Sequence, residues 1–291
     1  MQGQNNFISQ FFAETIKACE NSIKFEEGDY IGDDGLLYCH KCNTRKQKRF
    51  DENDESAGIL AGKVVPCLCK CGMEERNRKE QERQQILKRG EISDLKQKAF
   101  HNAEMAEWTF DKDDSADSII SKAMRKYVDN FSDMKKNGKG LILYGDVGTG
   151  KTFYAACVAN AVIEKGYSAL MTNFAEIINA MQEKFDGKQA YMSRLAEYGL
   201  LVIDDLGIER ETSFMREQVY NIIDTRYRSG NPLIITTNLS LQEMMSDTDI
   251  SKKRIYDRIL EMCLPVEVKG KSRRTKKAVE NFQDMRELLG L

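Results

Sequence analysis

The sequence GLILYGDVGTGKT, residues 140–152, decides the fold. Its first part is a short apolar run of the kind that forms a buried strand, and its second part fits G-x-x-x-x-G-K-[ST] at Gly145, Gly150, Lys151 and Thr152. A run compatible with a helix follows directly. Strand, glycine-rich turn and helix in this order predict a loop that wraps phosphate groups. A glycine-rich turn that binds nothing is the alternative, and the flanking strand and helix argue against it.

Each part of this loop has a predicted role. The glycines let backbone N–H groups approach phosphate oxygens, and the following helix directs its positive end at the same anion. Lys151 can reach the β- and γ-phosphates, and the Thr152 hydroxyl can ligate Mg²⁺. The predicted nucleotide-binding residues are Gly145, Asp146, Val147, Gly148, Thr149, Gly150, Lys151, Thr152 and Phe153.

Two later apolar runs also end in polar residues. In YGLLVIDDLG, Asp204 fits the carboxylate that holds Mg²⁺ through water, and Asp205 fits the base that polarises an attacking water. The run PLIITTN ends at Asn238, whose amide could hold a water near the γ-phosphate. Because ligands bind at the carboxyl ends of strands in open parallel sheets, these side chains are expected at one edge of the sheet. Taken alone, a strand-end Asn is usually a turn residue.

Pairs of arginines follow. Arg254 and Arg258 are four residues apart and therefore share one helical face, and Arg273 and Arg274 come after a short predicted strand, residues 264–268. A solvated charge is the default for any one arginine. Phosphoryl transfer, however, needs added positive charge in its transition state, so both interpretations stay open.

Length and composition limit the class of protein. The chain has 291 residues, enough for two domains, with 41% hydrophobic and 31% charged residues. With a net charge of −2, any nucleic acid must be met by a local basic patch. No apolar run is long enough to cross a bilayer, and the N-terminus does not read as a secretory signal. We therefore expect a cytoplasmic protein with no membrane partner.

Five of the eight cysteines fall between residues 39 and 71. Cys39-x2-Cys42 can present two thiolates to one ion, and Cys67, Cys69 and Cys71 alternate. Four thiolates suit tetrahedral Zn²⁺. Alternation alone does not choose among the last three, and we favour Cys39, Cys42, Cys69 and Cys71 as the zinc ligands, with Cys67 spare. Reduced structural cysteines without a metal are the alternative.

Changes in amino-acid composition along the sequence divide the chain into three predicted regions. Residues 1–72 are predicted to form a small zinc-binding domain, residues 73–105 a charged helical linker, and residues 106–291 an α/β nucleotide-binding domain with a parallel sheet.

The order of these motifs resembles the AAA+ ATPases of the bacterial helicase-loader group, the DnaC/DnaI type, which includes phage replication proteins and has the IstB transposition ATPase as a near relative. The resemblance rests on GDVGTGKT, LLVIDDLG, IITTN, KKRIYDRI and GKSRR, within residues 105–285. The cysteine region resembles the zinc-binding N-terminal domain of DnaI-type loaders. The implied fold is a three-layer αβα AAA+ P-loop core, preceded by a small zinc-stabilised helical or ribbon domain.

The resemblance implies residue roles. Asn238 matches the sensor-1 residue, Arg258 the finger that reaches the nucleotide of a neighbouring subunit, with Arg254 supporting it, and Arg274 the sensor-2 arginine of the same subunit. Trp108 lies where the family packs around adenine. The implied catalytic set is Lys151, Asp205, Asn238, Arg258 and Arg274.

The implied function is that of an ATP-dependent loader, which binds the replicative hexameric DNA helicase, delivers it onto single-stranded DNA and self-associates through its ATPase domain. Its cofactors would be ATP, Mg²⁺ and Zn²⁺. Many AAA+ enzymes carry Glu where this chain has Asp205, so slow hydrolysis is expected, with ATP acting mainly as an assembly switch. The alternatives are an IstB-like transposition ATPase, a nucleotide-gated adaptor with little hydrolysis, and a zinc module that binds DNA as a ribbon.

Overall fold

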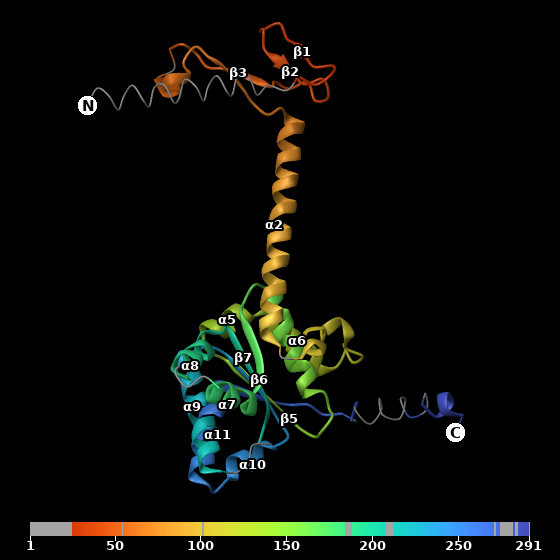
Figure 1. Ribbon diagram of the computed structural model, residues 1–291, viewed down its shortest axis with the longest axis vertical. Helices are drawn as coiled ribbons and strands as arrows, with labels where there is room; N and C mark the ends of the chain where they lie inside the picture. Colours follow the sequence, from red (N-terminus) through yellow and green to blue (C-terminus); the bar gives the residue numbers. More distant parts are fainter. Residues whose placement is uncertain are drawn as a thin grey trace, which may run out of the picture. The chain divides into compact units, whose positions relative to one another are not determined.

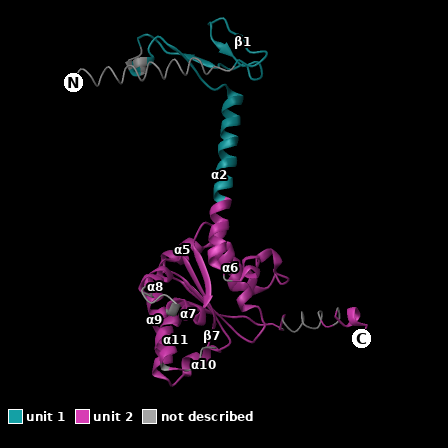
Figure 2. Cartoon of the chain, viewed as in Figure 1, with its two compact units in different colours: residues 1–88 teal, residues 89–291 magenta. Residues whose placement is uncertain are grey.

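The chain forms two compact units, residues 1–88 and 89–291, which are coloured separately in Figure 2. The computed structural model describes residues 25–53, 55–100, 102–183, 188–207, 212–270, 272–273, 282 and 285–290 (Figure 1). The division falls within the polar helix α2, Lys70–Ala99. The domain limits drawn from composition remain predictions. No helix in these ranges is both long and apolar enough to span a membrane.

The first unit is built from two short antiparallel hairpins and the start of α2. The hairpins pair β1 with β2 and β3 with β4. Its elements before α2 are β1 Tyr30–Ile31, β2 Leu37–Tyr38, β3 Gln47–Arg49, the 3-10 helix η1 Glu55–Leu60 and β4 Val64–Pro66. The buried apolar side chains of its described part are few, namely Leu36, Leu37, Cys39 and Cys69. A core this small needs a further source of stability, such as a metal site.

The second unit contains a five-stranded parallel sheet in the order β6-β7-β8-β5-β9. Its strands are β5 Gly140–Tyr144, β6 Ala169–Asn173, β7 Leu200–Leu206, β8 Leu233–Thr237 and β9 Cys263–Glu267. Its helices after α2 are α3 Ala103–Ala106, η2 Phe110–Lys112, α4 Ile119–Asp129, α5 Phe131–Lys136, α6 Lys151–Glu164, α7 Phe174–Glu183, α8 Lys188–Glu197, α9 Ser213–Ser229, α10 Leu241–Ser246 and α11 Ile250–Met262.

Helices cover both faces of this sheet (Figure 1). Alternate strand residues face opposite sides, so Leu141 and Val202 pack with residues of α4 and α6. Ile142 and Ile203 pack with residues of α7, α8, α9 and α11 on the other face. Strands buried on both faces read as continuous apolar runs, which is why the sequence revealed them. The predicted three-layer αβα arrangement of the AAA+ P-loop fold is confirmed.

A buried arginine ties together three points of this unit. Arg226 of α9 is 1% exposed, and no carboxylate pairs with it among the described residues. Its guanidinium donates only to backbone carbonyls, those of Leu195, Ala196, Tyr198, Gly199 and Pro232, at 2.5 to 3.5 Å. Burial lowers the pKa of Arg226 to about 9, so the group is still charged at neutral pH. The guanidinium therefore supplies hydrogen-bond donors to the carbonyl oxygens at the end of α8 and just before β7 and β8.

We expect Arg226→Met to lower the free energy of unfolding by at least about 3 kcal/mol, because several buried carbonyls lose their donor. Urea unfolding followed by circular dichroism measures this. The matched control is Arg228→Met on the same helix, whose guanidinium is exposed and pairs with Asp224 at 2.8 Å. That variant should lose less than about 1 kcal/mol. Equal losses in the two variants would contradict the anchoring role.

Candidate nucleotide site and cysteine cluster

The loop between β5 and α6 adopts the backbone that its glycines allow. Gly148 has φ +82°, and a Cβ there would lie 2.2 Å from Oγ of Ser272. Gly150, at φ +102°, is the left-handed residue from which α6 starts. The first N–H groups of α6 have no partner within the helix, so they face the loop together with the positive end of the helix dipole. This geometry suits a bound phosphate.

Lys151 lies in the concave side of this loop. The residue is 5% exposed, and its Nζ donates to the carbonyl oxygens of Gly145 at 2.8 Å and Asp146 at 2.7 Å. The Thr149 hydroxyl donates to the same Asp146 carbonyl at 3.0 Å. The loop is thus closed by its own polar side chains, with the ammonium already at its centre.

A cavity of about 490 Å³ opens beside the loop, a size suited to a small-molecule ligand. It brings Lys151 and Thr152 of the loop together with Asp205 and Asn238, two of the three strand-end residues that the sequence placed at one edge of the sheet. Its lining residues are Glu104, Trp108, Val147, Gly148, Gly150, Lys151, Thr152, Phe153, Asp205, Asn238 and Arg273. Trp108 and Phe153 lie side by side, with ring centroids 6.0 Å apart, and supply an apolar wall for a base.

Asp204 and Asp205 end the apolar part of β7, but they face different surroundings. Asp205 lines the cavity and has φ +58°, in the left-handed region. Asp204 does not line the cavity, and its Oδ1 accepts a hydrogen bond from the hydroxyl of Thr236 on β8. The two acids are therefore held in distinct positions.

Arg273 is a cavity residue that the sequence analysis did not select. Its guanidinium lies 3.3 Å from the buried carboxylate of Asp113 and 3.0 Å from the exposed carboxylate of Asp114. It also lies 5.4 Å from the centre of the Phe153 ring. Arg274, which the resemblance favours, lies outside the described residues. Arg273 and Arg274 are adjacent in one basic run, and nothing in the sequence itself distinguishes the position of one from that of the other.

The Asp113 carboxylate is the fixed partner of Arg273. Burial alone would raise its pKa, but the nearby Ser121 hydroxyl, a hydrogen bond from the N–H of Ser115 and the Arg273 guanidinium hold the pKa of Asp113 below its ordinary value. It is therefore ionised at neutral pH and orients the guanidinium at the cavity.

Arg258 does not line the nucleotide cavity. It lies on α11, where it forms an ion pair with Asp224 of α9. Its guanidinium is 4.6 Å from the ring centre of Tyr220 and 5.7 Å from that of Tyr227. The side chain remains 27% exposed. Arg254, one turn earlier, is exposed and lines a separate cavity of about 270 Å³.

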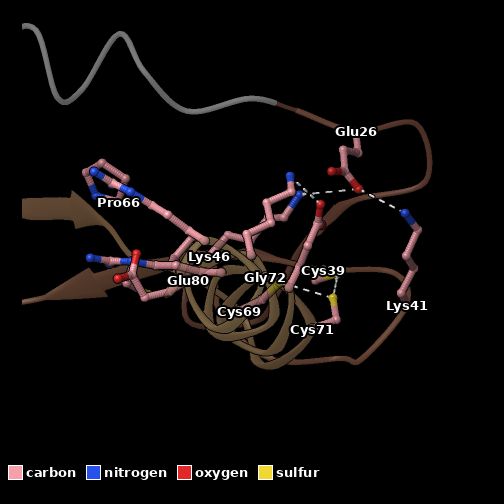
Figure 3. Close-up of a pocket in the computed structure, with 15 residues that line it drawn as sticks. Glu26, Cys39, Lys41, Lys46, Pro66, Cys69, Cys71, Gly72 and Glu80 are labelled. Carbon is pink, nitrogen blue, oxygen red and sulfur yellow. Dashed lines mark hydrogen bonds and ion pairs between the residues drawn. The ribbon is translucent and has the colours of Figure 1, made fainter. Parts of the chain in front are cut away.

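Four cysteines of the first unit form a cluster at the start of α2, and three of them, Cys39, Cys69 and Cys71, are labelled in Figure 3. The sulfur atoms of Cys39, Cys42, Cys69 and Cys71 all lie within 4.8 Å of one another. The Cys71 sulfur is 3.3 Å from that of Cys69 and 3.6 Å from those of Cys39 and Cys42. In a tetrahedral site with Zn–S bonds of about 2.3 Å, neighbouring sulfurs lie roughly 3.8 Å apart. The cluster therefore fits one metal ion, and zinc is the ion that four thiolates favour.

Cys67 and His40 are not part of this four-sulfur cluster, although His40 groups with Cys39 and Asp29. Cys67 is exposed, and its sulfur donates to the carbonyl of Arg45 at 3.5 Å. The His40 ring contacts Asp29, which also accepts a hydrogen bond from Lys46 at 2.5 Å. The cluster thus contains the four cysteines that the sequence favoured and leaves out the fifth. A broad cavity of about 920 Å³ borders it.

Comparison with known proteins identifies a family that matches most of the chain. The chain matches the family described as IstB-like ATP binding protein over residues 70–281. It is 32% identical over 146 residues to the replicative helicase loader DnaC of Escherichia coli (strain K12), covering 49% of this chain and 57% of the relative. It is 29% identical over 149 residues to the replicative helicase loader DnaI of Bacillus subtilis (strain 168), covering 47% of this chain and 48% of the relative. The chain thus spans about half the length of these curated relatives.

A crystal structure of DnaI superposes with a TM-score of 0.50 at 21% identity, over 59% of this chain and 96% of that one. At this identity the similarity concerns the fold alone, and it agrees with the αβα sheet described above.

We expect Cys39→Ser, Cys42→Ser, Cys69→Ser and Cys71→Ser each to lose bound zinc, because three thiolates hold the ion less tightly than four. Cys67→Ser is the matched control and should keep one zinc ion per chain. Atomic emission on the purified full-length variants measures the metal. Loss of zinc from Cys67→Ser, with zinc retained in Cys69→Ser, would show that the wrong thiol was chosen.

Proposed function

The chain belongs to the family of IstB-like ATP binding proteins, and from this premise we propose that it is an ATP-dependent loader of a replicative DNA helicase. It would bind the hexameric helicase and deliver it onto single-stranded DNA. The observation that carries the proposal is that the curated relatives from Escherichia coli and Bacillus subtilis are both replicative helicase loaders.

ATP binding is the first part of the proposal. The phosphates would lie against the N–H groups of the loop and the start of α6, with Lys151 turning from the carbonyls it now contacts to the β- and γ-phosphates. The base would pack on Trp108 and Phe153. Mg²⁺ would be held by Thr152 directly and by Asp204, which does not line the cavity, through a water, and it would neutralise charge on the phosphates. The 490 Å³ cavity that contains Lys151 and Thr152 supports this assignment.

Hydrolysis is the second part. Asp205 would polarise the attacking water and Asn238 would orient it, since both line the same cavity as Lys151. Arg273, or its neighbour Arg274, would supply positive charge from the same subunit. These assignments rest on positions at the cavity and on the resemblance to AAA+ enzymes.

Assembly is the third part. Arg258 does not line the cavity of its own subunit, and this supports a role at the nucleotide of a neighbouring one. To reach it, the guanidinium would have to leave Asp224 and the rings of Tyr220 and Tyr227. Self-association would therefore complete the active site in trans, at the expense of these contacts.

The cysteine module would bind the helicase. Zn²⁺ would hold its two hairpins together, which its few buried apolar residues support. The 920 Å³ cavity beside the cysteines offers a concave surface on the same unit. Two alternatives share the ATPase domain: a transposition ATPase that targets a transposase and duplex DNA, and an adaptor that binds ATP with little turnover.

We expect the full-length protein to co-elute with the replicative helicase of its host in gel filtration, more strongly with ATP than with ADP. Cys42→Ser should abolish the complex, because the module loses its metal, and Cys67→Ser should not. Absence of a complex with ATP, with ADP and without nucleotide would exclude the loader and leave the transposition and adaptor alternatives.

We expect an equimolar mixture of Lys151→Ala and Arg258→Ala chains to hydrolyse ATP faster than either variant alone. In mixed assemblies a Lys151→Ala subunit supplies its intact Arg258 to the intact nucleotide site of its neighbour. Steady-state phosphate release in the presence of single-stranded DNA measures the rate. A mixture that gives only the mean of the separate rates would argue against an arginine acting in trans.

A further inference from the structure

The pairing of β7 with β8 is irregular at the two acids. Ile203 pairs with Ile235, and Leu206 pairs with Thr237. Between these pairs β7 has two residues and β8 has one, so Asp204 and Asp205 together face Thr236. This is a β-bulge, a feature that redirects side chains and interrupts the ladder of backbone hydrogen bonds.

The hydroxyl of Thr236 lies at this break in the hydrogen bonding between β7 and β8. Its Oγ1 accepts a hydrogen bond from the backbone N–H of Asp205 at 2.9 Å and donates one to Oδ1 of Asp204 at 2.5 Å. Thr236 is fully buried. A threonine hydroxyl has one proton and two lone pairs, so this single group can serve both acids at once.

The bulge explains why Asp205 faces the cavity. Its φ of +58° is uncommon for a residue other than glycine, and such a conformation persists where its surroundings hold it. The hydrogen bond from its N–H to Thr236 is one such restraint. With the backbone turned in this way, Asp205 lines the cavity beside Lys151 and Asn238.

We propose that Thr236 is a positioning residue that holds Asp204 for a divalent cation and Asp205 for the attacking water. The inference rests on the proposed function and adds to it a residue that touches neither nucleotide nor metal. By holding Oδ1 of Asp204, Thr236 fixes the rotation of the carboxylate. By holding the N–H of Asp205, it fixes the backbone from which that carboxylate projects.

The neighbouring threonine provides a matched control. Thr237 is equally buried and lies on the same strand. Its Oγ1 donates to the carbonyl of Leu206 at 2.7 Å and accepts from the N–H of Leu239 at 3.1 Å. It contacts neither acid through its hydroxyl. Replacing each threonine by valine removes one buried hydroxyl at nearly constant volume, and only one of the two changes affects the acids.

The experiment compares full-length wild type, Thr236→Val, Thr236→Ala, Thr236→Ser and Thr237→Val. One readout is the Mg²⁺ concentration that gives half-maximal fluorescence of bound N-methylanthraniloyl-ATP, and the other is kcat and KM for ATP hydrolysis. Thr236→Val and Thr236→Ala should need about tenfold more Mg²⁺ and lose about tenfold or more in kcat, the usual effect of removing a partner behind a metal ligand. Thr236→Ser keeps the hydroxyl and should stay within about threefold of wild type on both readouts.

Thr237→Val should match wild type in Mg²⁺ requirement and kcat. The inference is overturned if Thr236→Val and Thr236→Ala keep the wild-type values, or if Thr237→Val loses as much as they do. Thr236→Ala is the second variant that removes the hydroxyl, and it adds no bulk in the buried site. Thermal melting establishes that each variant is folded. Failure of the wild type to bind the ATP analogue with Mg²⁺ would instead refute the proposed function.

Discussion

The buried guanidinium of Arg226 sets where two functional strands begin. It donates hydrogen bonds to carbonyl oxygens at the end of α8, just before β7, and at Pro232 before β8. An ionised group without a carboxylate partner is stable in such a place only when many dipoles surround it. β7 and β8 run parallel from these anchored starts, and their carboxyl ends lead to Asp205 and Asn238, which line the cavity.

At the carboxyl ends of β7 and β8, threonine hydroxyls take the place of hydrogen bonds between the two backbones. Thr236 and Thr237 bond across to β7 where the bulge has interrupted regular pairing. A buried polar group without a partner is costly, so a bulge inside a sheet needs such substitutes. Thr236 alone bonds the two acids, with Asp205 lining the cavity and Asp204 held against β8, while Thr237 bonds Leu206 just beyond them.

Much of this fold could be predicted from the sequence, and the reasons are physical. Strands buried on both faces produce unbroken apolar runs, and the glycine pattern around Lys151 has few other uses. The contacts that position these residues were not predictable. Arg226 lies in a polar helix whose sequence suggests a solvated charge, and the partners of Thr236 belong to another strand. Arg273 could not be singled out, because its partners Asp113 and Phe153 lie far from it in the sequence.

The conformation of Asp205 bears on why this position holds an aspartate. Short polar side chains tolerate the left-handed region better than longer ones do, because they can bond to nearby backbone. A glutamate, common at this position in AAA+ enzymes, would gain a methylene of reach and lose that tolerance. The shorter acid therefore suits the bulge, and a longer one would hold the same backbone at a cost in strain of roughly 1–2 kcal/mol. Side-chain length and backbone conformation at this position thus influence each other.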